Sequence, residues 1–189
     1  MTVPSADRRP ASLSVRPAGL GDAAAVARLL GKLAEQAHAD HPITATRVTT
    51  YLRHCGSHPD MYVNCVAEAV GGRAASGTGA RKWAGPVESA DMGAPGGPAV
   101  VGFLSAVFYE TPFHDKGTCL INELIVDADS RGSGVGRSLV ETAKAEAKRR
   151  GMDEIEVGTE KTNLAAQRFY KRLGFDEEFV LLGQDFHRE

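Results

Sequence analysis

The segment that most constrains the fold lies between Glu123 and Arg150, where an apolar strand pattern passes through a glycine-rich turn into a helix pattern. The turn reads Arg131-Gly132-Ser133-Gly134-Val135-Gly136. Glycines let a backbone turn tightly with its N–H groups pointing outward, and the start of a helix adds a partial positive charge. The turn therefore predicts an anion site suited to a pyrophosphate, to which Arg131 and Arg137 could add side-chain charge.

Three phosphate-binding patterns compete for this turn. A Walker loop ends in Gly-Lys followed by Ser or Thr, whereas here Arg137 follows Gly136. A dinucleotide fingerprint fails at its sixth position, which is Arg137, and the roughly 50 residues after it are too few to complete a Rossmann fold. The third pattern, Arg/Gln-x-x-Gly-x-Gly/Ala, is matched in full by Arg131, Gly134 and Gly136.

The rest of the chain predicts alternating strands and helices. Strands are expected at 13–16, 61–69, 100–109, 118–126 and 154–159, with a last strand or hairpin over 175–186. Helices are expected at 22–39 with Asp22 as N-cap, at 44–54, at 134–150 ended by Gly151, and at 163–173. This order predicts an α/β fold with a mixed central sheet flanked by helices.

The length of 189 residues allows one domain, which we expect over residues 13–189 after a loose tail over 1–12. Residues 71–98 hold eight of the 21 glycines and three of the nine prolines. Such a composition cannot bury much apolar surface and predicts a mobile insertion. Trp83 within it either pins the insertion to the surface or belongs to a lid over a substrate site.

Composition excludes several classes of protein. The balance of 22 basic and 24 acidic residues argues against a dedicated nucleic-acid binder. No apolar run approaches the roughly 18 residues of a membrane span, and no apolar stretch follows the N-terminal arginine pair as in a signal peptide. Three irregularly spaced cysteines fit a reducing cytoplasm. No metal site is expected, because no structural zinc pattern matches the spacing of His54, Cys55, His58 and Cys65.

The glycine-rich turn, taken with a second motif some 30 residues later, resembles the GCN5-related N-acetyltransferase (GNAT) superfamily. The second motif comprises Asn163, Ala166, Phe169-Tyr170 and Leu173-Gly174-Phe175. The turn alone is moderately specific, and the two motifs together are highly specific. The resemblance covers residues 118–176, and the insertion over 71–98 departs from it because the family usually joins those two strands by a short turn.

The resemblance implies that acetyl-CoA is the co-substrate and lies in a splayed gap between the strands at 118–126 and 154–159. Backbone groups of Leu124, Ile125 and Val126 would pair with the pantetheine arm, and the Leu124 N–H would polarise the thioester carbonyl. The resemblance places the pyrophosphate on Arg131, Gly132, Ser133, Gly134, Val135, Gly136, Arg137 and Ser138. Asn163 would contact the pantetheine or cap its helix, and Tyr170 would lie near the sulfur.

Acetyl transfer to an amine also needs a base and an acid. A lysine-like amine has a pKa of about 10.4, so near neutral pH it must lose a proton before it can attack. Glu123 points away from the face of Leu124 and is a candidate base, a binder of a cationic substrate, or one half of a salt bridge on a solvated face. Tyr170 is a candidate donor to the leaving thiolate, or else a core aromatic.

We therefore expect a cytoplasmic N-acetyltransferase that transfers the acetyl group directly, in a ternary complex, to a primary amine of a small cationic acceptor. A protein N-terminus or lysine is the second choice of acceptor. A non-catalytic acyl-CoA sensor is the alternative, although a pure binder needs neither Tyr170 nor Glu123. The apolar run Phe179–Leu182 either pairs across a homodimer or belongs to an ordinary sheet core. No nucleic acid, membrane or metal partner is expected.

Overall fold

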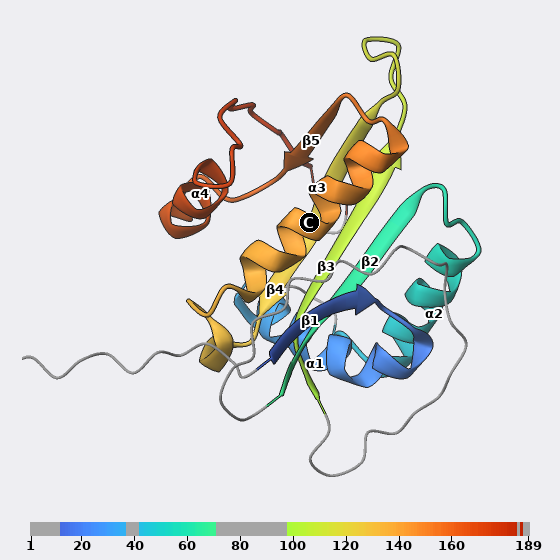
Figure 1. Cartoon of the computed structure of the whole chain (residues 1–189), viewed down its shortest axis with the longest axis vertical. Helices are drawn as coiled ribbons and strands as arrows, with labels where there is room; N and C mark the ends of the chain where they lie inside the picture. The colour runs from blue at the N-terminus through green and yellow to red at the C-terminus, as the bar shows by residue number, and fades with distance from the viewer. Residues whose placement is uncertain (1–11, 37–41, 71–97, 185, 187–189) are drawn as a thin grey trace, which may run out of the picture.

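A computed structural model of the chain describes residues 12–36, 42–70, 98–184 and 186. Five strands form one mixed sheet in the order β1-β2-β3-β4-β5 (Figure 1). They are β1 (Ser12–Pro17), β2 (Tyr62–Val70), β3 (Ala99–Tyr109), β4 (Thr118–Val126) and β5 (Glu154–Val157). The first four pair antiparallel, and β5 is parallel to β4. The predicted mixed α/β sheet is confirmed, whereas residues 1–11 of the expected tail and residues 71–97 of the expected insertion, with Trp83, lie outside the described residues.

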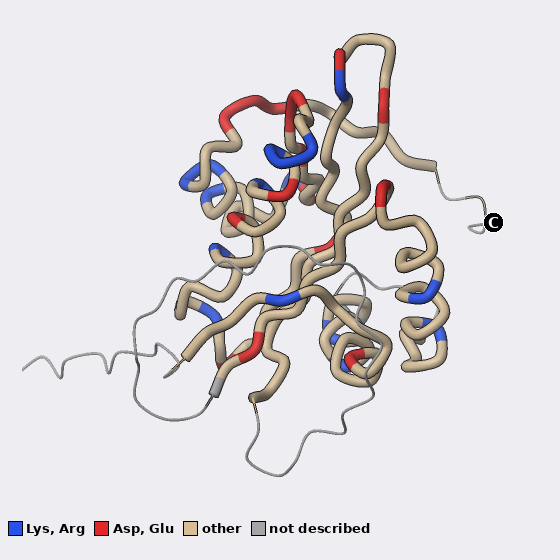
Figure 2. The backbone as a smooth tube through the Cα atoms, turned by 45° about the vertical axis from the view of Figure 1, so that its right-hand side comes forward, with Lys and Arg blue, Asp and Glu red and all other residues tan. Residues whose placement is uncertain are grey.

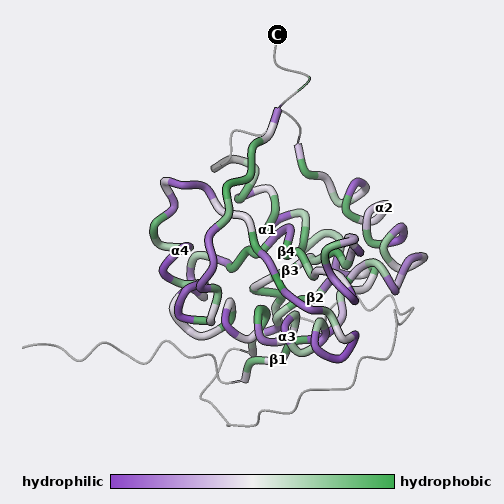
Figure 3. Tube along the Cα trace, turned by 90° about the horizontal axis from the view of Figure 1, so that it is seen from above, coloured by the Kyte–Doolittle hydropathy of each residue, from purple (hydrophilic) through white to green (hydrophobic). Residues whose placement is uncertain are grey.

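Helices cover both faces of the sheet, as the view from above shows (Figure 3). On one face lie α1 (Ala23–Gln36), which follows a 3-10 turn at Leu20–Asp22, and α2 (Ala45–Gly56). On the other face lies α3 (Val135–Arg150), and α4 (Leu164–Lys171) follows β5. Because each helix buries its apolar side against the sheet, the core divides into two hydrophobic clusters, one under α1 and α2 and one under α3.

The alternation of side chains along the strands assigns residues to these two clusters. In β3, Phe103 packs under α1 and α2, and its neighbour Leu104 packs under α3. In β2, the alternate residues Val63, Cys65 and Ala67 share the face under α3 and are buried. In α3, residues at helical spacing form the buried stripe against the sheet, at Val135, Leu139, Ala143 and Ala147.

The close approach of α3 to β3 depends on Gly102. A Cβ atom added there would lie 2.8 Å from Val135 Cγ1 and 2.9 Å from Leu139 Cδ1. We expect Gly102→Ala to lower the free energy of unfolding by about 1–3 kcal/mol through overpacking, measured by urea denaturation. The matched control is Gly31→Ala in α1, where nothing lies within 4 Å. That control should instead raise stability by roughly 0.5–1 kcal/mol, and equal shifts for both variants would contradict the prediction.

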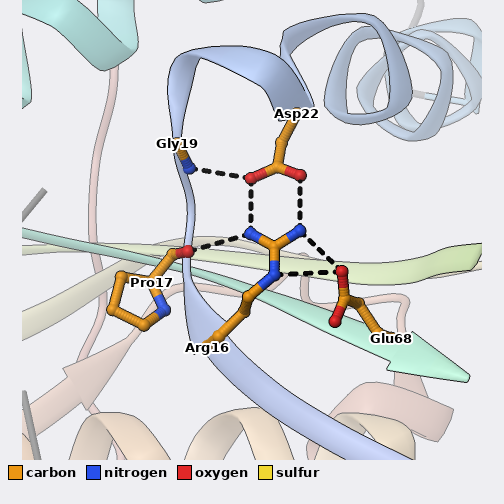
Figure 4. A network of polar contacts seen from close by, with 5 residues as sticks. All are labelled: Arg16, Pro17, Gly19, Asp22 and Glu68. Carbon is orange, nitrogen blue, oxygen red and sulfur yellow. Dashed lines mark hydrogen bonds and ion pairs between the residues drawn. The ribbon is translucent and has the colours of Figure 1, made fainter. Parts of the chain in front are cut away.

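A network around Arg16 ties the end of β1 to the start of α1 (Figure 4). Its guanidinium donates to both carboxylate oxygens of Asp22, at 2.7 and 2.8 Å, and to Glu68 of β2 at 2.6 Å. Asp22 also accepts from the Gly19 N–H at 2.7 Å. The expectation that Asp22 is the N-cap of the first helix is therefore wrong, because its carboxylate closes the preceding 3-10 turn and pairs with Arg16.

The strand expected over 175–186 does not form in the described part of this segment. Phe179, Val180, Leu181 and Leu182 are 72–90% exposed, and they appear as a green stretch leading towards the C-terminus in Figure 3. A strand needs a partner for its backbone hydrogen bonds. Within the described ranges this run has none, and an ion pair between Glu178 and Lys171 holds the start of the segment near α4.

Candidate active site

The pairing between β4 and β5 covers only the first part of β4, because β5 ends at Val157. The two strands pair only from Thr118 to Ile121, opposite Glu154 to Val157. In the β3–β4 ladder, Glu123 pairs with Ser105 and Ile121 pairs with Ala106, which leaves Asn122 as a bulge. A bulge bends a strand, and this one comes where the pairing with β5 ends. The rest of β4, with Leu124, Ile125 and Val126, has no β5 partner and leaves backbone hydrogen-bonding groups available on that edge.

The glycine-rich turn links this open edge to α3. Gly132 and Gly134 have φ angles of 78° and 95°, a region that favours glycine. Gly134 is the N-cap of α3 and, having no side chain, makes no side-chain cap bond. The Ser138 N–H bonds to the Gly134 carbonyl at 3.0 Å. The N–H groups of Val135, Gly136 and Arg137 precede this first helical bond, and they therefore face outward with the positive end of the helix dipole.

The polar side chains of the glycine-rich turn have two roles: one stabilises the turn, and the others face solvent. Ser133 is buried, and its hydroxyl donates to the Ser130 carbonyl at 2.5 Å, so it shapes the turn. Arg131 is exposed and donates from Nε to the Val126 carbonyl at 3.3 Å, over the end of β4. Arg137 is exposed, and Ser138 is half-buried on the first turn of α3. The outward groups are thus backbone N–H groups and two guanidinium side chains.

Two motif residues belong to α4 and its N-cap. Asn163 caps this helix, because its Oδ1 accepts from the Ala166 N–H at 3.1 Å, which is one of its two expected roles. Tyr170 is buried in the same hydrophobic cluster as Leu124 and Val126, with ring centroids 5.1 Å from Phe169 and 5.5 Å from Phe175. Burial raises the pKa of Tyr170 to about 12, so its hydroxyl keeps its proton at neutral pH.

Glu123 lacks the cationic partner that most other buried or half-buried acids near the sheet have; Glu156 also lacks one, but it accepts from the Tyr109 hydroxyl at 2.9 Å. Figure 2 shows charges of both signs interspersed along the chain. Asp22 pairs with Arg16, Asp127 with Arg28 and Lys32, and Glu146 with Arg149 and Arg150. Glu123 has no Lys, Arg or His partner in the described ranges, so the salt bridge weighed for it is not observed. Burial raises the pKa of Glu123, and a weaker opposing influence comes from the Ser105 hydroxyl.

Glu123 is the end of a polar row that crosses three strands. Glu123 of β4 pairs with Ser105 of β3, which pairs with Asn64 of β2. Above the row, the Tyr51 hydroxyl of α2 lies 2.7 Å from Ser105 Oγ. Sequence reasoning missed Tyr51, Ser105 and Asn64. The available signal was that Ser105 and Asn64 each interrupt an apolar strand, but only the strand register shows that they are neighbours.

Other expectations concern membranes, metals and disulfides. Every helix in the described ranges is too short or too polar to cross a bilayer. In the same ranges, no three His, Cys, Asp or Glu side chains are grouped as metal ligands would be. Cys55, Cys65 and Cys119 are all buried free thiols.

Comparison with known proteins adds to this geometry. The profile described as "Acetyltransferase (GNAT) family" matches residues 80–175. An uncharacterized N-acetyltransferase of Methanocaldococcus jannaschii is 44% identical over 63 residues, which are 33% of this chain and 28% of that protein. N-alpha-acetyltransferase 30 of Schizosaccharomyces pombe is 38% identical over 76 residues, 39% of this chain and 50% of that protein. The matches therefore span half or less of these relatives' lengths.

A solved structure agrees with the fold. The complex of AAC(6')-Iy with the bisubstrate analogue CoA-S-monomethyl-acetylneamine superposes with a TM-score of 0.65 at 16% identity. The alignment covers 92% of this chain and 98% of that chain. At this identity, the likeness concerns the arrangement of the helices and strands.

Proposed function

This chain belongs to the acetyltransferase (GNAT) family, and from that premise we propose that it transfers the acetyl group of acetyl-CoA to a primary amine of a small cationic acceptor. The observation that carries the proposal is Glu123, a partly buried carboxylate without a cationic partner in the described ranges, next to the open edge of β4. A buried acid costs stability unless it is paired, so a functional role accounts for its place.

The proposed binding mode for acetyl-CoA uses two backbone features. The pantetheine arm adds to the open edge of β4 along Leu124, Ile125 and Val126, as an extended peptide adds to a sheet edge. The pyrophosphate lies on the N–H groups from Gly132 to Gly136, with Arg131, Arg137 and Ser138 beside them. This mode is supported by the outward N–H groups at the start of α3 and by the CoA-containing analogue in the AAC(6')-Iy complex.

The proposed chemistry uses the side chains of Glu123 and Tyr170, which lie on opposite faces of the sheet. Glu123 faces the side of α1 and α2, where its carboxylate takes the proton of the acceptor ammonium, directly or through a water molecule. The freed nitrogen lone pair forms a bond to the acetyl carbon, and the Leu124 N–H stabilises the charge that develops on the carbonyl oxygen. As the C–S bond breaks, Tyr170 donates its proton to the thiolate from the side of α3. The acylated nitrogen releases its surplus proton to solvent to give the amide, and solvent returns a proton to the Tyr170 phenolate and takes the one held by Glu123.

The acceptor class is proposed from charge. Glu123 supports a cationic amine, and the exposed loop after β3 adds Glu110 and Asp115 beside one cation, Lys116. The second candidate is a protein N-terminus or lysine, because N-alpha-acetyltransferase 30 is among the relatives by sequence. The same fold serves many acceptors, so the fold itself does not choose between these two.

A thiol-release assay with acetyl-CoA, across small polyamines, amino sugars and short peptides, tests this proposal. We expect release with a small cationic amine. Release with peptides alone would replace the small-amine proposal by the second candidate. No thiol release with any acceptor, together with tight CoA binding by calorimetry, would indicate an acyl-CoA sensor. The absence of CoA binding would contradict the assignment of the Arg131–Gly136 turn as the pyrophosphate site.

We also propose a cytoplasmic homodimer. The three free thiols favour a reducing compartment. The exposed run Phe179–Leu182 offers a strand-length apolar segment for pairing between two chains. Sedimentation should give a dimer mass that Leu181→Lys reduces to that of a monomer, whereas a monomeric wild-type chain would contradict the proposal.

A further inference from the structure

The surroundings of Glu123 raise the question of how its charge is tolerated. The elements packed around it contribute neutral groups: Ser105 and Asn64 from the sheet, and Tyr51 and Cys55 from α2. The residues of α1 in the same cluster are apolar. Because no described cation faces the carboxylate, the described groups able to stabilise its ionised form are neutral hydrogen-bond donors.

We propose that Tyr51 and Ser105 are positioning residues that form a directed hydrogen-bond chain, Tyr51 to Ser105 to Glu123, which aims the carboxylate and holds it ionised. The role of this chain in catalysis rests on the proposed function, whereas its effect on the ionisation of Glu123 does not. Neither residue needs to touch the acceptor or acetyl-CoA.

The direction of the chain follows from the number of protons. A serine hydroxyl carries one proton, so Ser105 can donate to one group only. If it donated to Tyr51, it would turn an oxygen lone pair towards the Glu123 carboxylate, which is repulsive. The 2.7 Å contact between Tyr51 and Ser105 permits the opposite direction, in which the phenol donates and Ser105 donates onward to Glu123.

Burial preserves the hydrogen-bond partners of Ser105 and keeps the Tyr51 hydroxyl protonated. Ser105 is fully buried, so no solvent molecule can replace its partners. Burial is also the main reason that the pKa of Tyr51 is raised, which keeps the phenol protonated and able to donate. Cys55, one turn later on α2, has its thiol pKa raised by burial as well and is therefore neutral beside Tyr51.

The same chain tolerates the protonated form of Glu123. When the carboxyl takes the proton of an amine, it becomes a donor to Ser105, and Ser105 can then donate to the Tyr51 oxygen. Reversal of the two hydroxyls leaves no buried polar group of the chain unpaired. No proton leaves the chain in this step, since the amine proton stays on Glu123.

The test measures Glu123 directly in the protein without substrates. Carbon-13 NMR of glutamate-labelled protein follows the side-chain carboxyl during a pH titration, and Glu123→Gln identifies its resonance. Ser105→Ala should raise the midpoint for Glu123 by about one pH unit, because a donor to the charged form is lost. Tyr51→Phe should raise it by less, because Ser105 keeps its proton but loses its orientation. Tyr62→Phe, which removes a hydroxyl from the same sheet face outside the chain, should leave the midpoint unchanged.

The outcomes separate this proposal from the proposed function. The proposed hydrogen-bond chain would be contradicted, whatever the activity is, if Tyr51→Phe left the titration midpoint of Glu123 unmoved or if Tyr62→Phe moved it equally. Shifted midpoints in a protein without transferase activity would support the chain and contradict the proposed function. In an active enzyme, the acid limb of kcat/KM should move to higher pH in the same order, with acetyl-CoA affinity unchanged.

Discussion

Replacing Glu123 by glutamine is expected to lower kcat by about 10²–10⁴-fold, the range that general acid–base catalysis typically contributes. Glutamine keeps the shape of the side chain and its place opposite Ser105, but it cannot accept the ammonium proton. Acetyl-CoA affinity, measured by calorimetry, should be unchanged because the proposed contacts with pantetheine and pyrophosphate do not involve the Glu123 side chain. The matched control is Glu141→Gln on the exposed side of α3, which should leave kcat unaltered.

The raised pKa of Glu123 also predicts how the activity depends on pH. Because burial raises the pKa of Glu123, the ionised base is lost as the pH falls through a value above the ordinary glutamate pKa of about 4.3. The acid limb of kcat/KM should therefore lie above that value in the wild type and be absent from the residual activity of Glu123→Gln. An unchanged limb in this variant would show that another group is the base.

Replacing Tyr170 by phenylalanine is expected to lower kcat by roughly 10²-fold through loss of the proton donor, with little change in acetyl-CoA affinity. Phenylalanine preserves the ring contacts with Phe169 and Phe175, so stability should change little. Burial raises the pKa of Tyr170 to about 12, so its hydroxyl stays protonated below that pH. The wild type should therefore not lose activity through deprotonation of Tyr170 as the pH rises towards 12.

Acyl donors with different leaving groups separate catalysis by Tyr170 from a packing role. A thiol of low pKa leaves without help, so the defect of Tyr170→Phe should shrink when the acetyl donor carries such a leaving group. A defect of the same size with every donor would assign Tyr170 to the core. A variant as active as the wild type would remove Tyr170 from the mechanism.

Local sequence signals predicted most of the fold. The strand at 118–126 and the ends of α3 follow from alternation, helical periodicity and two glycines, all of which act over a few residues. The expected strand over 175–186 failed because a strand depends on a partner edge, and an apolar run alone does not supply one. Asp22 failed as a cap because Arg16 and the Gly19 N–H, which local propensity ignores, hold its carboxylate.

The sequence by itself determined the mixed sheet, the family and the glycine-rich turn, because these depend on residues that are close together in the chain. It also singled out Glu123 as a carboxylate in an apolar strand, and the family resemblance singled out Tyr170. Only the tertiary structure decided that Glu123 lies opposite Ser105 and beneath Tyr51, since strand register and helix docking join residues about 20 to 70 positions apart. Register depends on the packing of whole faces, and a shift of one residue would turn every side chain to the other face.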